Sequence, residues 1–175
     1  AKRAQNKFPN DNNLKAHFNE LYNVNLTQQI DGAAKLFEQQ KYNEALNAYN
    51  SIQVKNEAVL LGIAGCKFYL NDLTSSIDYY KKALEVNPQN TDTAYYIGLA
   101  YFNLKDFNNS KNYLNKAIKL NPNNKNAKEL LALTYYTIAQ TNEEQGNKEA
   151  AVNNYLNALK FDSNLKEVYY SLGVT

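Results

Sequence analysis

The chain has 175 residues, of which 44% are hydrophobic, and its charged side chains leave a net charge of +2. This apolar content is enough for a core and excludes wholesale disorder, and the interspersed charges give no basic surface of the kind that binds nucleic acid. No run approaches the roughly eighteen apolar residues of a membrane span. Cys66 is the only cysteine, so no internal disulfide can form and the compartment of the protein stays undetermined.

The first 25 residues are predicted to form a tail and a capping helix that precede the regular part of the chain. Residues 1–11 are polar and basic, and we expect a loose terminus there. A short helix is predicted from Asn12 to Tyr22, with its apolar residues on one face, and we expect it to cap the first helix pair. His17 has no second ligand beside it in the sequence, so no metal site is predicted.

Two pairs of helices are predicted next. Apolar residues at helical spacing place the first pair near residues 27–39 and 43–52, and the second pair near residues 57–70 and 74–87. In the second pair Asp72 lies in the turn, and Thr74 is the predicted N-cap of the second helix.

The clearest pair occupies residues 91–124. Ile97 and Ala100 lie on one face of its first helix, and Pro122 ends the pair because proline cannot extend a helix. The pattern returns when the frame is shifted by 34 residues. A period of this length indicates a stacked array of helix pairs rather than a globule with one closed core.

The fourth unit is longer than the others. Residues 125–165 exceed the period by seven residues. Seven residues turn a helix by about 20° less than two full turns, so they lengthen it by about 10 Å without rotating its buried face. No proline or glycine lies between Ala127 and Gln145, so one long helix is predicted. The sequence leaves open whether the extension lies at the start of this helix, 126–131, or at its end, 141–145.

The repeated units share small and large residues at fixed spacing. These residues are Leu60, Ile63, Ala64, Ser76, Ala83 and Pro88 in the second unit and Gly98, Tyr101, Ser110, Ala117 and Pro122 in the third. The units resemble the tetratricopeptide repeat, with Lys67 as a departure where the family pattern has an aromatic residue. Residues 26–56 form a copy that is shorter by three residues.

This resemblance implies an all-α fold, an α-solenoid of stacked antiparallel helix pairs wound into a right-handed superhelix. A repeat domain over residues 26–175 is expected. Its units are residues 26–56, 57–90, 91–124, 125–165 and a partial unit 166–175.

In this family the first helices of successive repeats line a concave surface. Transferring the lining positions to this chain predicts an apolar, aromatic groove made of Ile30, Phe37, Leu61, Phe68, Tyr69, Tyr95, Leu99, Phe102, Leu133, Tyr136 and Tyr170. Apolar surfaces of this kind mark binding sites for another chain. The alternatives are a lining that reflects only packing within the family, or a groove filled by the protein's own N-terminal helix.

Some family members hold the acidic C-terminal tails of heat-shock chaperones with lysine, asparagine and arginine side chains. In this chain the corresponding positions hold Ile30, Ala34, Gly62, Asp92 and Tyr96. A carboxylate clamp of this kind is therefore not expected. The polar side chains available to anchor a partner are Asp92, Asn103, Asn126 and Glu129.

No serine, cysteine or lysine is paired with a suitable base, and no glycine-rich phosphate loop follows a strand. We therefore predict no enzyme activity and no cofactor. The first hypothesis is an interaction module that holds an amphipathic helix or an aromatic-rich peptide in its groove. The alternatives are self-assembly through the open terminal repeat and a targeting domain of a larger enzyme. Because the chain starts without methionine and ends within a repeat, we expect a processed or excised chain, or a last helix that acts as a cap.

Overall fold

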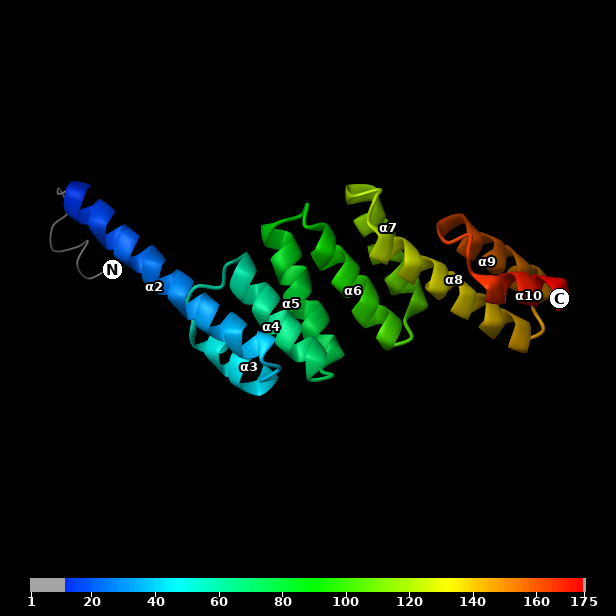
Figure 1. Cartoon of the computed structure of the whole chain (residues 1–175), viewed down its shortest axis with the longest axis horizontal. Helices are drawn as coiled ribbons and strands as arrows, with labels where there is room; N and C mark the ends of the chain where they lie inside the picture. The colour runs from blue at the N-terminus through cyan, green and yellow to red at the C-terminus, as the bar shows by residue number, and fades with distance from the viewer. Residues whose placement is uncertain (1–11, 175) are drawn as a thin grey trace.

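The computed structural model describes residues 12–174, and within this range the chain is all α-helical, without strands. Figure 1 shows the helices in a row along the long axis, with the two ends of the described chain at opposite ends of the row. The helices are α2 (Asn12–Glu38), α3 (Tyr42–Ser51), α4 (Glu57–Tyr69), α5 (Leu73–Val86), α6 (Thr91–Asn103), α7 (Phe107–Leu120), α8 (Lys125–Glu144), α9 (Lys148–Phe161) and α10 (Lys166–Val174). The predicted all-α fold is confirmed.

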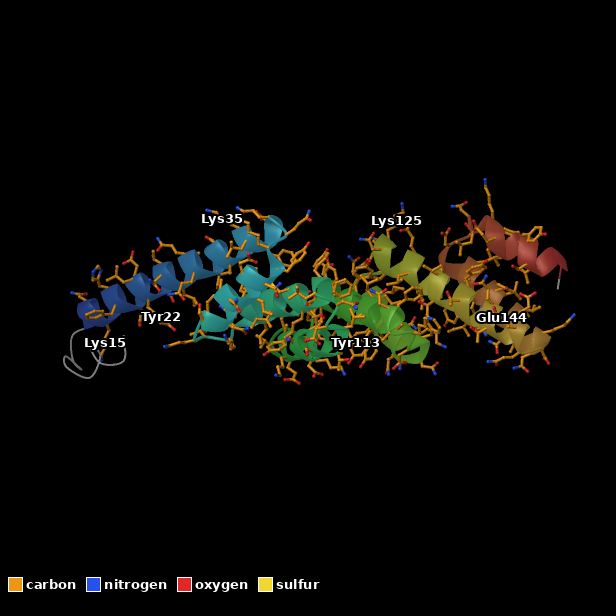
Figure 2. The ribbon with its side chains drawn as sticks, turned by 90° about the horizontal axis from the view of Figure 1, so that it is seen from below. Lys15, Tyr22, Lys35, Tyr113, Lys125 and Glu144 are labelled. Atoms are coloured by element: carbon orange, nitrogen blue, oxygen red, sulfur yellow. The ribbon has the colours of Figure 1, made fainter. Side chains whose placement is uncertain are left out.

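The helices pack in consecutive pairs, and each pair packs against the next. The buried residues fall into successive clusters along the row: one among α2, α3 and α4, a second among α4, α5 and α6, a third among α6, α7 and α8, and a fourth among α8, α9 and α10. This is the expected α-solenoid. In Figure 2, Lys35 of α2 and Lys125 of α8 project from one side of the row, and Tyr113 of α7 lies on the other. Since each pair buries its apolar face only against its neighbours, the pairs stabilise one another.

Polar side chains start most of the helices in the middle of the stack. The side chains of Asn56, Asp72, Asn90, Asp106 and Asn124 each accept a hydrogen bond from a backbone N–H three residues further on. A cap of this kind stabilises a helix by about 1 kcal/mol.

The predicted N-cap of α5, Thr74, is wrong. The Asp72 carboxylate accepts the hydrogen bond from the Ser75 N–H at 3.3 Å, and Thr74 lies within the first turn of the helix. The predicted bounds of the second pair agree with the structure within one residue, and both helices of the third pair lie within the predicted residues 91–124.

The turn inside each pair contains a residue with a left-handed backbone. These residues are Gln40, Asn71, Lys105 and Gly146, with φ of 60°, 62°, 61° and 78°. The backbone N–H of each donates to a carbonyl three residues before it, as from Lys105 to Phe102 at 2.9 Å. The helix ends are therefore closed in the same way in four successive units, although only the last uses glycine.

The N-terminal helix differs from the prediction. The prediction of a separate short helix from Asn12 to Tyr22 is wrong, because one helix, α2, runs for 27 residues. No proline or glycine interrupts residues 12–26, so nothing in the sequence ends a helix there. The expected boundary between residues 25 and 26 falls inside α2. Its N-terminal half projects beyond α3 (Figure 1), with Leu21 and Tyr22 51% and 43% exposed. The predicted tail, residues 1–11, lies outside the described residues.

The predicted long helix of the fourth unit is confirmed as α8. It has 20 residues, whereas α4 and α6 have 13 each, a difference equal to the seven-residue insertion. Asn124 caps α8 as Asn90 caps α6, one period earlier. Leu131 is fully buried in α8, as is Ile97 at the equivalent place in α6. The extension therefore lies at the C-terminal end of the helix. The sequence alone had left open whether it lies at the start or at the end.

The extension moves α9 along α8 by two turns. The first half of α8 adds Leu130 and Leu131 to the cluster that contains Leu114 of α7. The second half adds Ala139 to the cluster that contains Tyr155 of α9. One helix thus closes the third pair with its first half and forms the fourth pair with its second half.

Candidate functional site

A pocket lies among the first helices of the N-terminal pairs. It has a volume of about 490 Å³, and α2, α4 and α6 supply most of its wall. Aromatic side chains dominate the lining, and Asp92 is the one Asp, Glu, Lys or Arg residue in it. The aromatic members are Phe37, Tyr49, Phe68, Tyr69, Tyr80 and Tyr96.

Two glycines of α4 form part of the pocket wall. A Cβ placed on Gly62 would clash with the ring of Tyr49, and one placed on Gly65 would lie 3.3 Å from the Phe37 ring. Both rings therefore approach the bare backbone of α4. Glycine is required at position 62 for this packing, because any side chain there would displace the Tyr49 ring.

Contacts among the rings hold the aromatic wall in place. Phe37 meets Tyr69 edge to face, with ring centroids 5.5 Å apart, and Tyr69 stacks on Tyr42 at 4.8 Å. Across the pocket, Tyr80 stacks on Tyr96 at 5.6 Å. Aromatic pairs of this kind add about 0.5–1.5 kcal/mol each beyond the area they bury. The half-exposed rings of Tyr69 and Tyr96 are therefore positioned before any ligand arrives.

The polar side chains at the rim of the pocket are of two kinds: hydrogen-bonded asparagines and a carboxylate without a hydrogen-bond partner in the described chain. Asn90 accepts a hydrogen bond from the Thr93 N–H at 2.9 Å and donates to the Glu57 carboxylate at 2.7 Å. Asn87 also donates to Glu57, at 3.0 Å. By contrast, Asp92 is exposed in the first turn of α6, and no hydrogen bond or ion pair joins its side chain to another residue in 12–174.

Two buried phenols lie in the pocket wall. Tyr49 and Tyr80 are each only 5% exposed, and neither hydroxyl hydrogen-bonds to another residue of the described chain. Burial raises the pKa of both phenols above the ordinary value, and the carboxylates of Glu38 and Asp31 act in the same direction on the pKa of Tyr49. Both phenols are therefore neutral near pH 7, with their oxygen atoms free to accept a hydrogen bond.

The thiol of Cys66 lies behind the pocket. It is fully buried among α2, α3 and α4, and burial raises its pKa to about 11. A protonated, inaccessible thiol is a packing element rather than a nucleophile.

The structure brings five of the eleven predicted groove residues to this pocket: Ile30, Phe37, Leu61, Phe68 and Tyr69. The groove residues predicted from the family positions did not include Tyr49, Tyr80 and Tyr96. Tyr49 and Tyr80 belong to second helices, which the family positions leave out. Gly62 and Gly65 were the sequence feature that could have indicated these aromatic contacts, because glycine inside a helical pattern often marks a close approach of another group.

The structure does not bring the other six predicted residues to the pocket. Tyr95, Leu99 and Phe102 are half-buried against the cluster of α6, α7 and α8. Tyr136 packs against the α9 cluster, with its ring centroid 5.8 Å from that of Tyr155. Leu133 and Tyr170 are 41% and 77% exposed.

Residues 12–174 contain neither a metal-ion cluster nor a membrane span. No group of three or more His, Cys, Asp or Glu side chains there is arranged to hold a metal ion. None of the helices in that range combines the length and the hydropathy needed to cross a membrane.

Three family models match the chain, and all describe tetratricopeptide repeats. The model of the Fis1 C-terminal tetratricopeptide repeat matches residues 91–140, a TPR repeat model matches residues 144–175, and a tetratricopeptide repeat model matches residues 58–90. No curated protein matches the chain in sequence.

Solved structures share the fold at low sequence identity. The first TPR of Spaghetti (RPAP3), bound to the HSP90 peptide SRMEEVD, aligns over 65% of this chain and 93% of its own, with 23% identity and a TM-score of 0.62. MamA aligns over 95% of both chains, with 16% identity and a TM-score of 0.64. The Sgt2 TPR domain from Aspergillus fumigatus aligns over 68% of this chain and 82% of its own, with 20% identity and a TM-score of 0.62. At these identities the similarity concerns the fold.

Proposed function

Because the chain is a tetratricopeptide-repeat protein, we propose that it is a non-catalytic interaction module that holds a peptide segment of a partner protein. The pocket among α2, α4 and α6 is its principal contact. Leu133, Tyr136 and Tyr170 extend the binding surface toward the C-terminal end.

The observation that carries this proposal is the aromatic pocket itself. Ligand pockets are commonly clefts of about 300–1,000 Å³ with mostly apolar walls and a few polar groups. The pocket of about 490 Å³ has six aromatic rings, with Asp92 as its acidic residue. The stacking of Tyr69 on Tyr42 and of Tyr80 on Tyr96 fixes the rings in advance, which lowers the entropic cost of binding.

The relatives in structure support a peptide ligand. The RPAP3 domain holds an HSP90 peptide whose sequence, SRMEEVD, is mainly acidic at its end. In this chain no lysine or arginine lines the pocket. Its lining includes four of the positions that form the clamp in other family members, and here they hold Ile30, Gly62, Asp92 and Tyr96. We therefore propose that the peptide is of another kind than an acidic chaperone tail.

The affinity expected from the apolar lining alone is weak. A peptide that covers about 400 Å² of it would gain about 10 kcal/mol gross. Ordering the peptide and losing overall freedom offset roughly 6–9 kcal/mol of this gain. The remainder corresponds to binding no tighter than about the millimolar range, so a tighter partner must also use a polar anchor.

The proposal is tested with peptides selected from a random display library and measured by fluorescence anisotropy. Tyr69→Ala removes a pocket ring that is 57% exposed, and Tyr169→Ala removes a ring on α10 that is 55% exposed and outside the pocket. We expect about tenfold or greater loss of affinity for Tyr69→Ala, since a buried aromatic contact contributes more than about 1.4 kcal/mol. Tyr169→Ala should bind as the wild type does. Equal affinities for all three proteins would contradict the proposed site.

Self-association is a second candidate function. Leu21, Tyr22 and Val24 are about half exposed on the projecting half of α2, and Tyr170 is 77% exposed on α10. Such residues favour contact with another chain. Sedimentation velocity at increasing protein concentration would test it, and a constant monomeric coefficient would remove it.

A further inference from the structure

The pocket rings lack a cation, although lysines of this chain lie over tyrosine rings elsewhere. The face of a tyrosine ring is electronegative and attracts a cation. Within residues 12–174 no lysine lies over a pocket ring in this way. The pairs that do form are Lys81 over Tyr101 at 5.4 Å, Lys82 and Lys67 over Tyr79 at 4.8 and 6.0 Å, and Lys111 over Tyr135 at 5.5 Å.

The charges around the pocket are mostly negative. Asp92 lines it without a partner in the described chain. Asp31 and Glu38 of α2 lie near enough to Tyr49 to contribute to its raised pKa. Lys35 lies between them in α2, and all three lie outside the pocket lining, where together they leave one negative charge. In a cleft with apolar walls, a local excess of carboxylates attracts a positively charged ligand.

The pocket has free atoms that can accept a hydrogen bond from a ligand: hydroxyl oxygens, which can also donate, and one carboxylate. The phenol oxygens of Tyr49 and Tyr80 are unoccupied by the described chain, and the Asp92 carboxylate can only accept when ionised. Tyr80 and Gly65 both line the pocket, and the Tyr80 oxygen lies 3.8 Å from where a Cβ on Gly65 would be. Arginine and lysine side chains are donor-only, and the guanidinium is the more weakly hydrated and stacks on aromatic rings.

We infer that the pocket receives an arginine side chain of the partner, so that the peptide this protein binds is basic. The inference rests on the proposed function, because it names the residue that anchors the peptide. The alkyl stem of the arginine contacts Ile30 and Leu61, and the guanidinium lies over the pocket tyrosines within reach of Asp92. A lysine in the same place binds more weakly, since its ammonium loses more hydration.

The test is an NMR titration of the ¹⁵N-labelled full chain with blocked pentapeptides, acetyl-Gly-Ser-X-Ser-Gly-amide, in which X is arginine, lysine, citrulline or norleucine. Citrulline keeps the size and planarity of arginine without its charge. The amides of Gly62 and Gly65 report on the pocket wall, and that of Gly146, in the turn before α9, is the internal control. We expect the arginine peptide to shift only the pocket amides, and to bind at least about fivefold more tightly than the citrulline peptide.

Two variants with the same change of charge complete the test. Asp92→Asn should lower the affinity for the arginine peptide about threefold or more and leave the citrulline peptide unaffected. Asp78→Asn, on the exposed face of α5 and outside the pocket, should change neither. Added salt should weaken the arginine peptide alone, because screening acts on the charged pair.

The outcomes separate this inference from the proposed function. If citrulline or norleucine binds at the pocket as well as arginine does, the cationic anchor is overturned and peptide binding stands. If no pentapeptide shifts Gly62 or Gly65 at about 10 mM, the arginine anchor is overturned. The display library then decides the proposed function independently, because it contains apolar anchors as well.

Discussion

The ring of Tyr80 stacks on that of Tyr96, with centroids 5.6 Å apart and planes 8° from parallel. One repeat earlier, Tyr49 occupies the place of Tyr80 and Gly62 the place of Tyr96, and the Tyr49 ring rests against the glycine. The same contact between a second helix and the next first helix is thus made by two tyrosines in one repeat and by a tyrosine and a glycine in the other. The glycine keeps this part of the pocket wall free of a second ring.

Substitution of Gly62 tests this contact. We expect Gly62→Ala to destabilise the protein by about 1–2 kcal/mol, because the displaced Tyr49 ring costs more than the roughly 1 kcal/mol that alanine gains in helix propensity. The matched control is Gly32→Ala in α2, where a Cβ meets no atom within 4 Å. That variant should stabilise the protein by about 0.5–1 kcal/mol. Urea unfolding followed by circular dichroism measures both, and stabilisation by Gly62→Ala would contradict the packing described.

The left-handed turn residues give a second prediction. Lys105 has φ of 61°, a conformation that costs a non-glycine residue about 1 kcal/mol or more. Lys105→Gly should therefore raise the free energy of unfolding by about 0.5–1 kcal/mol. Lys116→Gly, at an exposed position inside α7, should lower it by a similar amount. Thermal denaturation of the two variants should thus give shifts of opposite sign.

The aspartate caps make stability depend on pH in the acid range. The hydrogen bond from Lys67 lowers the pKa of Asp72, and that from Asn109 lowers the pKa of Asp106. A carboxyl whose pKa is lowered by folding stabilises the protein above its unfolded pKa of about 3.9 and loses that contribution as the pH falls through the folded value. We expect the double variant Asp72→Asn/Asp106→Asn, whose amides still cap, to lose less stability than the wild type between about pH 5 and pH 2. Parallel curves for the two proteins would rule out this role.

The extension of α8 gives a prediction about length. Deleting residues 138–144 removes close to two full turns and leaves the face toward α9 almost unrotated. We expect this variant to remain helical and to unfold cooperatively. Deleting residues 138–142 rotates everything beyond by about 140°, which turns Tyr155 and its neighbours in α9 away from α8. That variant should lose the packing of α9, seen as rapid amide exchange over residues 148–161. Equal protection of α9 in both variants would argue against the shared helix.

Features that depend only on the spacing of residues along the chain could be predicted without the structure. The 34-residue period indicated stacked helix pairs, because each pair is too small to bury its own apolar face. The seven-residue insertion predicted one long helix with an unrotated face, since helix geometry alone relates residue number to rotation. No tertiary contact enters either argument.

Which side chains contact one another could be read only from the folded chain. It showed that α2 continues through residues 22–26 and that the extension of α8 lies at its end. It also brought Tyr49 and Tyr80 into the pocket and left Tyr95 and Tyr136 out of it. Transferring positions between repeats treats every unit as equal. The space between neighbouring helices depends instead on the paired volumes of facing residues, as where Gly62 makes room for Tyr49.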